Sequence, residues 1–236
     1  MEIIPGIHKI DGIRGANCYL VVSGTEMLVI DTGMPGNGNR IINYIKGLGK
    51  KASDISCIVL THADIDHVGS AAELKKMTTA KLAIHEDEAA VLAGKTRGKD
   101  VKGLLGLLFK LMSPLIRFHP IDPDIILKDN IDIAGFKVIH TPGHTNGSIC
   151  LYLSGKIIFV GDALRNDSNG NPRLPSKSMS ADIVQAKASL IAISELEFDS
   201  LFPGHGAPVI GQASTKLKNL VKDLKRNDQI PNTKSK

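Results

Sequence analysis

The sequence predicts a mixed α/β (α+β) fold in which sheets and helices are stacked in layers. Short apolar runs of strand character alternate with stretches of helical spacing, first in residues 17–92 and again in residues 131–224. Apolar residues make up 42% of the 236 positions and charged residues 22%, which is a globular composition with enough apolar surface for a core. We therefore expect two sheets covered by helices.

The first half begins with strands and a helix. Residues 17–23 and 27–30 are apolar runs separated by Gly24-Thr25-Glu26, which is a hairpin signal. Residues 40–48 have apolar side chains at helical spacing, and Gly49 is expected to end that helix. The chain then continues with a strand at 57–60, a polar loop at 61–69, a helix at 70–77, a strand at 81–84 and a helix at 86–92.

Residues 94–119 differ from their surroundings and are predicted to be an insertion on the domain. The segment is first basic and rich in glycine, and then strongly apolar, with Pro114 interrupting any helix. Two interpretations stay open. The apolar part lines an acyl-sized substrate pocket or forms a lid, or it is buried against the domain or against a second subunit in a homodimer.

The second half repeats the mixture of strands and helices. Strands are expected at 131–139, 148–153 and 156–160, with Ser154-Gly155 as a tight turn. Ser180 is predicted to cap a helix over 181–196. A short strand at 199–202 and an amphipathic helix around 217–224, with its lysines outward, complete the chain.

The charge is confined to the end of the chain. Residues 216–236 hold seven basic and two acidic residues, which equals the whole net charge of +5, so residues 1–215 balance at 22 against 22. We predict a single domain over 1–215 followed by a basic helix and tail over 216–236. With no Trp and three Tyr, stacking on single-stranded nucleic acid is not expected.

The expected cellular location and the expected state of the cysteines rest on patterns that are missing from the sequence. No apolar run reaches the roughly 18 residues of a membrane span, and residues 1–12 have no signal-peptide pattern, so a cytoplasmic protein without a membrane span is expected. Cys18, Cys57 and Cys150 lie far apart in apolar runs and form no CxxC pair, which predicts buried, unreactive thiols rather than a thiolate metal site.

Four polar clusters follow the ends of predicted strands, and they contain the residues expected to carry chemistry. They are THADIDH at 61–67, TPGHT at 141–145, GDA at 161–163 and PGHG at 203–206. Loops at strand ends are where functional sites are commonly built. Imidazole and carboxylate side chains bind zinc, iron and manganese. In the first cluster His62 and Asp64 can point to one side, while Asp66 and His67 start the following helix, so one loop can serve two neighbouring metals.

The order of these clusters resembles the metallo-β-lactamase superfamily, whose signature is HxHxDH followed by a distant His, a bridging Asp and a last His. Here the series reads VIDTG, HADIDH, TPGHT, GDA and PGHG, over residues 17–208. The resemblance implies a four-layer αββα sandwich with a dinuclear metal site at the edge between the sheets. It also implies a hydrolase similar to the glyoxalase II and lactonase-like branch.

Carried over by position, the resemblance implies a role for each polar side chain. Asp31 would support the ligand loops from behind. The expected metal ligands are His62 and His144 at the first metal, Asp66, His67 and His205 at the second, and Asp162 as the bridging carboxylate.

Asp64 stands where the family has its second histidine, and it is expected to be an additional ligand. An oxygen ligand shifts metal preference from zinc towards iron or manganese. Zinc remains the expected metal at both positions, with iron and manganese as alternatives.

The predicted reaction is hydrolysis of a small ester, thioester or lactone by a metal-activated water, with Asp66 orienting the water and shuttling a proton to the leaving group. The alternatives are a phosphodiesterase or nuclease-type hydrolase and an iron-dependent oxygen or redox enzyme, the latter suggested by Asp64. A non-enzymatic binding scaffold is a further alternative, but the complete set of Asp66, His67, Asp162 and His205 argues against it.

Overall fold

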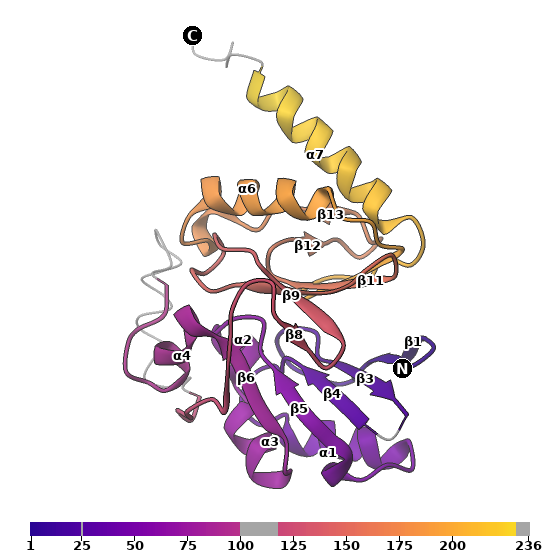
Figure 1. Ribbon diagram of the computed structural model, residues 1–236, viewed down its shortest axis with the longest axis vertical. Helices are drawn as coiled ribbons and strands as arrows, with labels where there is room; N and C mark the ends of the chain where they lie inside the picture. The colour runs from indigo at the N-terminus through magenta and orange to yellow at the C-terminus, as the bar shows by residue number, and fades with distance from the viewer. Residues whose placement is uncertain (25, 100–117, 230–236) are drawn as a thin grey trace.

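The computed structural model describes residues 1–24, 26–99 and 118–229. Two sheets face each other and helices cover their outer faces, which gives four layers (Figure 1). The first sheet has the strand order β1 (Glu2–Ile4), β2 (Ile7–Lys9), β3 (Tyr19–Ser23), β4 (Glu26–Ile30), β5 (Ile55–Val59), β6 (Lys81–His85) and β7 (Ile125–Leu127).

The second sheet is formed by the second half of the chain. Its strand order is β14 (Ser200–Pro203), β11 (Ile157–Gly161), β10 (Ile149–Leu153), β9 (Phe136–His140) and β8 (Asp132–Ile133). A small hairpin of β12 (Arg165–Asn166) and β13 (Pro172–Arg173) lies beside it. The predicted two-sheet, four-layer α/β architecture is confirmed.

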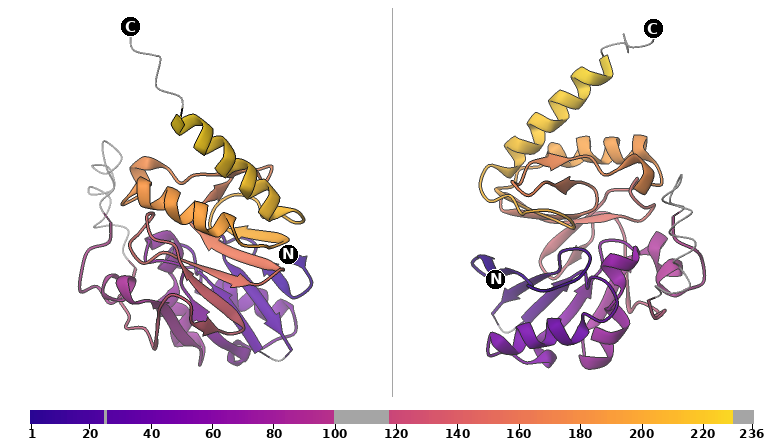
Figure 2. Two further views of the ribbon diagram at one scale, coloured as in Figure 1. Left: turned by 45° about the horizontal axis from the view of Figure 1, so that its top comes forward. Right: turned by 180° about the vertical axis from the view of Figure 1, so that it is seen from behind.

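Helices cover the outer face of each sheet (Figure 2). The first half supplies α1 (Gly38–Gly47), the short α2 (Ile65–Val68), α3 (Ala71–Met77) and α4 (Glu86–Leu92). The second half supplies α6 (Ile183–Ser194) and α7 (Ala213–Gln229). Single 3₁₀ turns, η1 (Ala52–Asp54) and η2 (Lys177–Met179), connect elements.

Three hydrophobic cores hold the four layers together. Because strand side chains alternate between faces, Met27 and Val29 of β4 pack against α1 and α3, while Leu28 and Ile30 face the other sheet. The central core joins the sheets through residues such as Tyr19, Phe159 and Phe202. The third core packs the second sheet against α6 and α7, whose inward side chains include Leu190, Ile193, Leu217 and Val221.

The strand directions bring the polar clusters to one edge of the sandwich. β4 and β5 are parallel, and so are β11 and β14. β9 runs in the same direction as β11, because both are antiparallel to β10 between them. The carboxyl ends of β4 and β5 in one sheet, and of β9, β11 and β14 in the other, therefore open towards the loops that carry the predicted site.

Several local predictions are wrong. The strand expected over 131–139 is the hairpin of β8 and β9, because Ala134 and Gly135 adopt φ values of 48° and 83° and turn the chain. Helix α6 is capped by Asp182, whose Oδ1 accepts hydrogen bonds from the backbone of Val184 and Gln185, at 2.8 and 3.1 Å. Ser180, the predicted cap, instead donates to the carbonyl of Ser176. Strands β1, β2 and β7 are not predicted at all.

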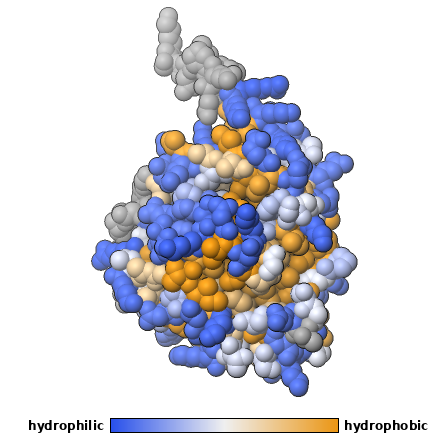
Figure 3. Space-filling view, in the orientation of Figure 1, coloured by the Kyte–Doolittle hydropathy of each residue, from blue (hydrophilic) through white to orange (hydrophobic). Residues whose placement is uncertain are grey.

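Other expectations are met or remain open. Cys18, Cys57 and Cys150 are buried free thiols, and burial raises the pKa of Cys57 to about 11 and of Cys150 to about 12. Most of the predicted insertion, residues 100–117, lies outside the described residues, and the predicted domain boundaries remain predictions. Within the described ranges, none of the helices has the length and apolar character needed to cross a membrane. Hydrophilic side chains predominate along α7 at the surface (Figure 3).

Candidate metal centre

The seven predicted ligand side chains gather where the strand ends of the two sheets meet. His62 follows β5, and Asp64, Asp66 and His67 lie at the start of α2 directly after it. His144, Asp162 and His205 follow β9, β11 and β14 of the other sheet. The structure thus brings together all seven residues from opposite sides of the sandwich.

The first group consists of His62, Asp64 and His144, whose ligand atoms lie within 4.8 Å of one another. Oδ2 of Asp64 is 3.4 Å from Nε2 of His62 and 3.0 Å from Nε2 of His144. Asp64 has extended backbone angles at the residue before α2, so its side chain turns towards His62. This geometry groups Asp64 with the two histidines expected at a first metal position.

The second group consists of Asp66, His67 and His205, again within 4.8 Å. Oδ2 of Asp66 lies 3.2 Å from Nε2 of His205. Burial raises the pKa of Asp66, but the hydrogen bond and charge of His205 and the charge of His67 outweigh it, so the net shift is downward and the carboxylate stays ionised.

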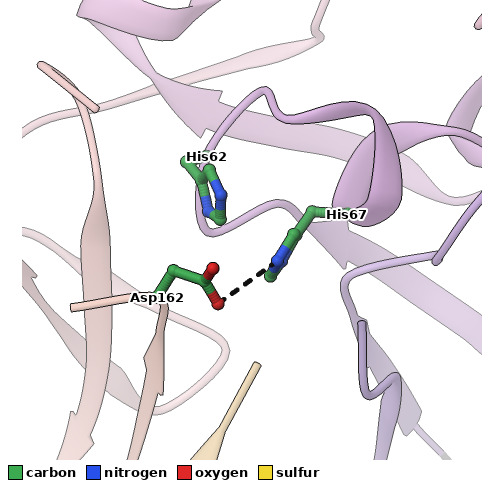
Figure 4. A group of neighbouring side chains, drawn as sticks. All are labelled: His62, His67 and Asp162. Atoms are coloured by element: carbon green, nitrogen blue, oxygen red, sulfur yellow. Dashed lines mark ion pairs between the residues drawn. The ribbon is translucent and has the colours of Figure 1, made fainter. Parts of the chain in front are cut away.

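Asp162 lies between the two groups. Its Oδ1 is 3.4 Å from Nε2 of His67, and its Oδ2 is 3.4 Å from Nε2 of His144 and 3.5 Å from Nε2 of His205. Figure 4 shows His62, His67 and Asp162 pointing towards a common centre. Asp162 therefore contacts both groups, with Oδ2 lying between His144 and His205 and Oδ1 beside His67, as a ligand shared by two ions would.

Gly204 makes this close approach feasible. A Cβ atom at Gly204 would lie 2.4 Å from Oδ1 of Asp162 and 2.7 Å from Cε1 of His67. Any side chain at this position would therefore push into Asp162 and His67. Gly204 is therefore needed for this close packing; it is not among the glycines with a positive φ.

Asp31 and Thr61 orient the histidines from behind. Buried Asp31 accepts hydrogen bonds from the backbone and the hydroxyl of Thr61, both at 2.8 Å, and its Oδ2 lies 2.8 Å from Nδ1 of His67. Because a carboxylate only accepts, Nδ1 of His67 donates to Asp31, which leaves Nε2 facing the site. The Thr61 hydroxyl, 3.1 Å from Nδ1 of His62, fixes His62 in the same way.

The chemistry of these donors fits divalent metal ions. Nε2 of His62, Nε2 of His67 and Oδ1 of Asp162 are buried and have no hydrogen-bond partner among the described residues. Buried polar atoms are nearly always satisfied, so three unpaired ones facing one centre indicate a ligand. Four imidazoles and three carboxylates are the donor types that zinc, iron and manganese bind.

The surroundings of the cluster determine the protonation states of His144 and Asp162. Burial lowers the pKa of His144 to about 4, although the hydrogen bond with Asp64 acts in the opposite direction. His144 is therefore a neutral donor near pH 7. Burial raises the pKa of Asp162, but the nearby imidazole of His67, together with those of His144 and His205, holds it well below its usual range.

Glu88 supports the centre and was missed by the sequence analysis. It lies in α4, and its buried carboxylate accepts hydrogen bonds from the backbone of Ala63 at 2.8 Å and of Gly147 at 2.9 Å. It therefore ties the loop that holds His62 to the loop that holds His144. Nothing in the sequence distinguishes Glu88 from its neighbours Glu86 and Asp87. Its role depends on hydrogen bonds to two distant loops, and these form only in the folded chain.

An open pocket of about 190 Å³ gives access to the candidate ligands. Its floor includes Asp64, Asp66, His144, Asp162 and His205. Its wall is formed by the segment after Asp162 and contains Arg165, Pro175, Ser176 and Met179. A small molecule entering this pocket would meet the ligand cluster directly.

The sequence is similar to those of known proteins. Residues 11–205 match the family model described as the metallo-beta-lactamase superfamily. The chain is 27% identical to "Probable metallo-hydrolase YflN" of Bacillus subtilis, over 89% of this chain and 88% of that protein. It is 31% identical to "Probable metallo-hydrolase YqgX" of the same organism, over 66% of this chain and 72% of that protein.

Solved structures share the fold. A metallo-beta-lactamase of Cronobacter sakazakii with a HARLDQ motif superposes with a TM-score of 0.71 at 19% identity, over 97% of this chain and 93% of that chain. BJP-1, a subclass B3 metallo-beta-lactamase of Bradyrhizobium japonicum, superposes with a TM-score of 0.68 at 24% identity, over 96% of this chain and 92% of that chain.

Proposed function

The chain belongs to the metallo-beta-lactamase superfamily, and we propose that it hydrolyses a small ester, thioester or lactone at the cluster around Asp162. The fold is that of metal-dependent hydrolases, so the prediction of an enzyme of this type is confirmed. The substrate class, the individual ligands and the metal identity are the proposal.

One observation carries the proposal: two groups of ligand atoms flank Asp162 at the floor of an open pocket. Each group provides three donors within 4.8 Å, as a divalent ion requires. The pocket, at about 190 Å³, is smaller than the roughly 300–1,000 Å³ of sites for drug-sized ligands. It therefore favours a small substrate over a polymer.

We assign the ligands by these contacts. His62, Asp64 and His144 would hold an ion at the first position, and Asp66, His67 and His205 at the second, with Asp162 between them. We propose zinc, with iron and manganese as alternatives because the set contains three carboxylates. When bound, such ions supply Lewis-acid polarisation of a carbonyl and lower the pKa of water.

Asp66 is the residue proposed to move the proton. Its side chain is about one-third exposed and lines the pocket, so it can reach both an attacking water and a leaving group. Its pKa lies below the usual range, so it begins as a carboxylate and can accept a proton. His205, 3.2 Å from its Oδ2, fixes the orientation of the carboxylate.

Metal analysis combined with a substrate panel tests the proposal. Protein loaded separately with zinc, iron and manganese would be assayed on p-nitrophenyl acetate, an acyl thioester, a lactone and bis(p-nitrophenyl) phosphate. We expect the highest turnover on one of the three carbonyl substrates, and its loss on chelation.

Other results would point to the alternatives. Faster cleavage of the phosphodiester would replace the proposal with a phosphodiesterase or nuclease-type hydrolase. Retained iron with oxygen consumption would indicate a redox enzyme. Protein that retains no metal in any medium would rule out the metal-dependent reaction.

A further inference from the structure

A lysine side chain occupies the first group of candidate ligands. Nζ of Lys99 lies 2.5 Å from Oδ2 of Asp64 and 2.5 Å from Nε2 of His144. The Lys99 side chain is only 5% exposed, although the residue lies in an irregular segment beyond α4. Burial of an ammonium group is costly unless it is paired, and Asp64 provides the opposite charge.

The contacts of Lys99 use the same atoms that a metal ion would need. A divalent ion at the first position would bind the lone pairs of Asp64 and His144 at roughly 2.0–2.2 Å. In the structure Lys99 donates hydrogen bonds to both of these atoms. An ammonium group and a metal ion cannot share them, so the two cations exclude each other at this position.

The second group is free of this competition. Among the described residues, the polar contacts of Lys99 are with Asp64 and His144, and not with Asp66, His67 or His205. A divalent ion can therefore bind at the second position while Lys99 stays in place.

Charge balance agrees with this arrangement. The cluster contains the carboxylates of Asp64, Asp66 and Asp162. One divalent ion together with one ammonium group neutralises three carboxylates. A second divalent ion with Lys99 still in place would leave an excess of positive charge in a buried site, which favours departure of the lysine.

We propose that Lys99 is the resident cation of the first position, so that the protein binds one divalent ion firmly and a second only by displacing Lys99. This inference rests on the proposed metal-dependent function. It also gives Asp64 a reason to differ from histidine: a carboxylate can pair with an ammonium group, whereas a neutral imidazole supplies no opposite charge.

Zinc stoichiometry of three proteins tests the inference. Wild type, Lys99→Met and Lys95→Met would be stripped with a chelator, reloaded with zinc and desalted, and the bound zinc counted by native mass spectrometry. Lys95 is the matched control, because it lies in the same segment and pairs with Asp122 at 2.9 Å on the surface. We expect one zinc per chain in wild type and Lys95→Met, and two in Lys99→Met.

Titration gives a second readout. The second zinc should bind roughly tenfold or more tightly to Lys99→Met than to wild type. If Lys99→Met does not fold, Lys99→Gln replaces it in both experiments, and circular dichroism checks that the replacement variant is folded.

Two outcomes overturn the inference while leaving the function intact. In the first, wild type and Lys99→Met each bind two zinc ions with the same affinity. In the second, each of the two proteins binds only one zinc ion. Absence of zinc from every variant would instead overturn the proposed function and the inference with it.

Discussion

Asp31 and His67 form a buried pair behind the candidate metal centre, with Oδ2 of Asp31 2.8 Å from Nδ1 of His67. The backbone of Asp31 has a φ of 58°, in the left-handed region that non-glycine residues adopt uncommonly, and asparagine, aspartate and histidine most often among them. The chain thus keeps an unfavourable backbone conformation at the end of β4, and the carboxylate placed there orients a proposed ligand.

Asp31→Asn should weaken zinc binding by roughly 10- to 100-fold. Asparagine tolerates the same backbone conformation and keeps the shape, so the substitution removes mainly the charge that holds Nδ1–H of His67. Competition with a chromophoric chelator measures the affinity. Asp122→Asn, at an exposed ion pair, is the control, and equal affinities in the two variants would show that Asp31 does not act on the centre.

Asp66→Asn should lower turnover by roughly 10²- to 10⁴-fold. The amide has nearly the same shape but cannot accept a proton from water, and it is a poorer ligand. Steady-state kinetics on the best carbonyl substrate, with melting curves to confirm an intact fold, measures the effect. Unchanged turnover would refute the role assigned to Asp66.

Glu88→Ala should destabilise the metal-free protein by about 1–3 kcal/mol for each hydrogen bond that it loses. The backbone N–H groups of Ala63 and Gly147 would stay buried without an acceptor. Urea denaturation of chelator-treated protein gives the free energy of unfolding.

Glu86→Ala is the matched control for Glu88, since Glu86 lies on the same helix with its carboxylate in an exposed pair with Lys128. Surface pairs of this kind contribute about 0–1 kcal/mol. If both variants lose the same stability, Glu88 does not join the two ligand loops.

Asp64→His should raise zinc affinity at the first position. An imidazole reaches further than a carboxylate and is a good zinc ligand, and the change also removes the opposite charge that pairs with Lys99. Calorimetric titration with zinc measures this affinity, with Asp122→His, at an exposed ion pair, as the control. Metal content indifferent to this substitution would mean that Asp64 is not a ligand.

Local patterns in the sequence were sufficient for the layered α/β architecture, whereas the four layers and the grouping of the candidate ligands were implied by the resemblance to the metallo-β-lactamase superfamily. The apolar run from Met27 to Ile30 predicts a strand, and the structure places its successive residues in different cores. The histidine and aspartate clusters each follow a strand, and parallel strands end at one edge.

Contacts between distant elements could not be predicted in this way. Glu88 and Lys99 act through loops that are adjacent only after the two sheets pack together. The hairpin at Ala134 and Gly135 was missed for a different reason: two turn residues inside an apolar run resemble an uninterrupted strand.

The division of the ligands between the two sheets links metal binding to the assembly of the chain. Residues up to His67 supply one part of the set, and His144, Asp162 and His205 supply the other, so neither half alone offers a complete site. A bound ion would close chain loops of very different length, from the short 61–67 turn to the separation between His67 and His205. It would act as a reversible cross-link across the central core, and its release would remove that link between the two halves.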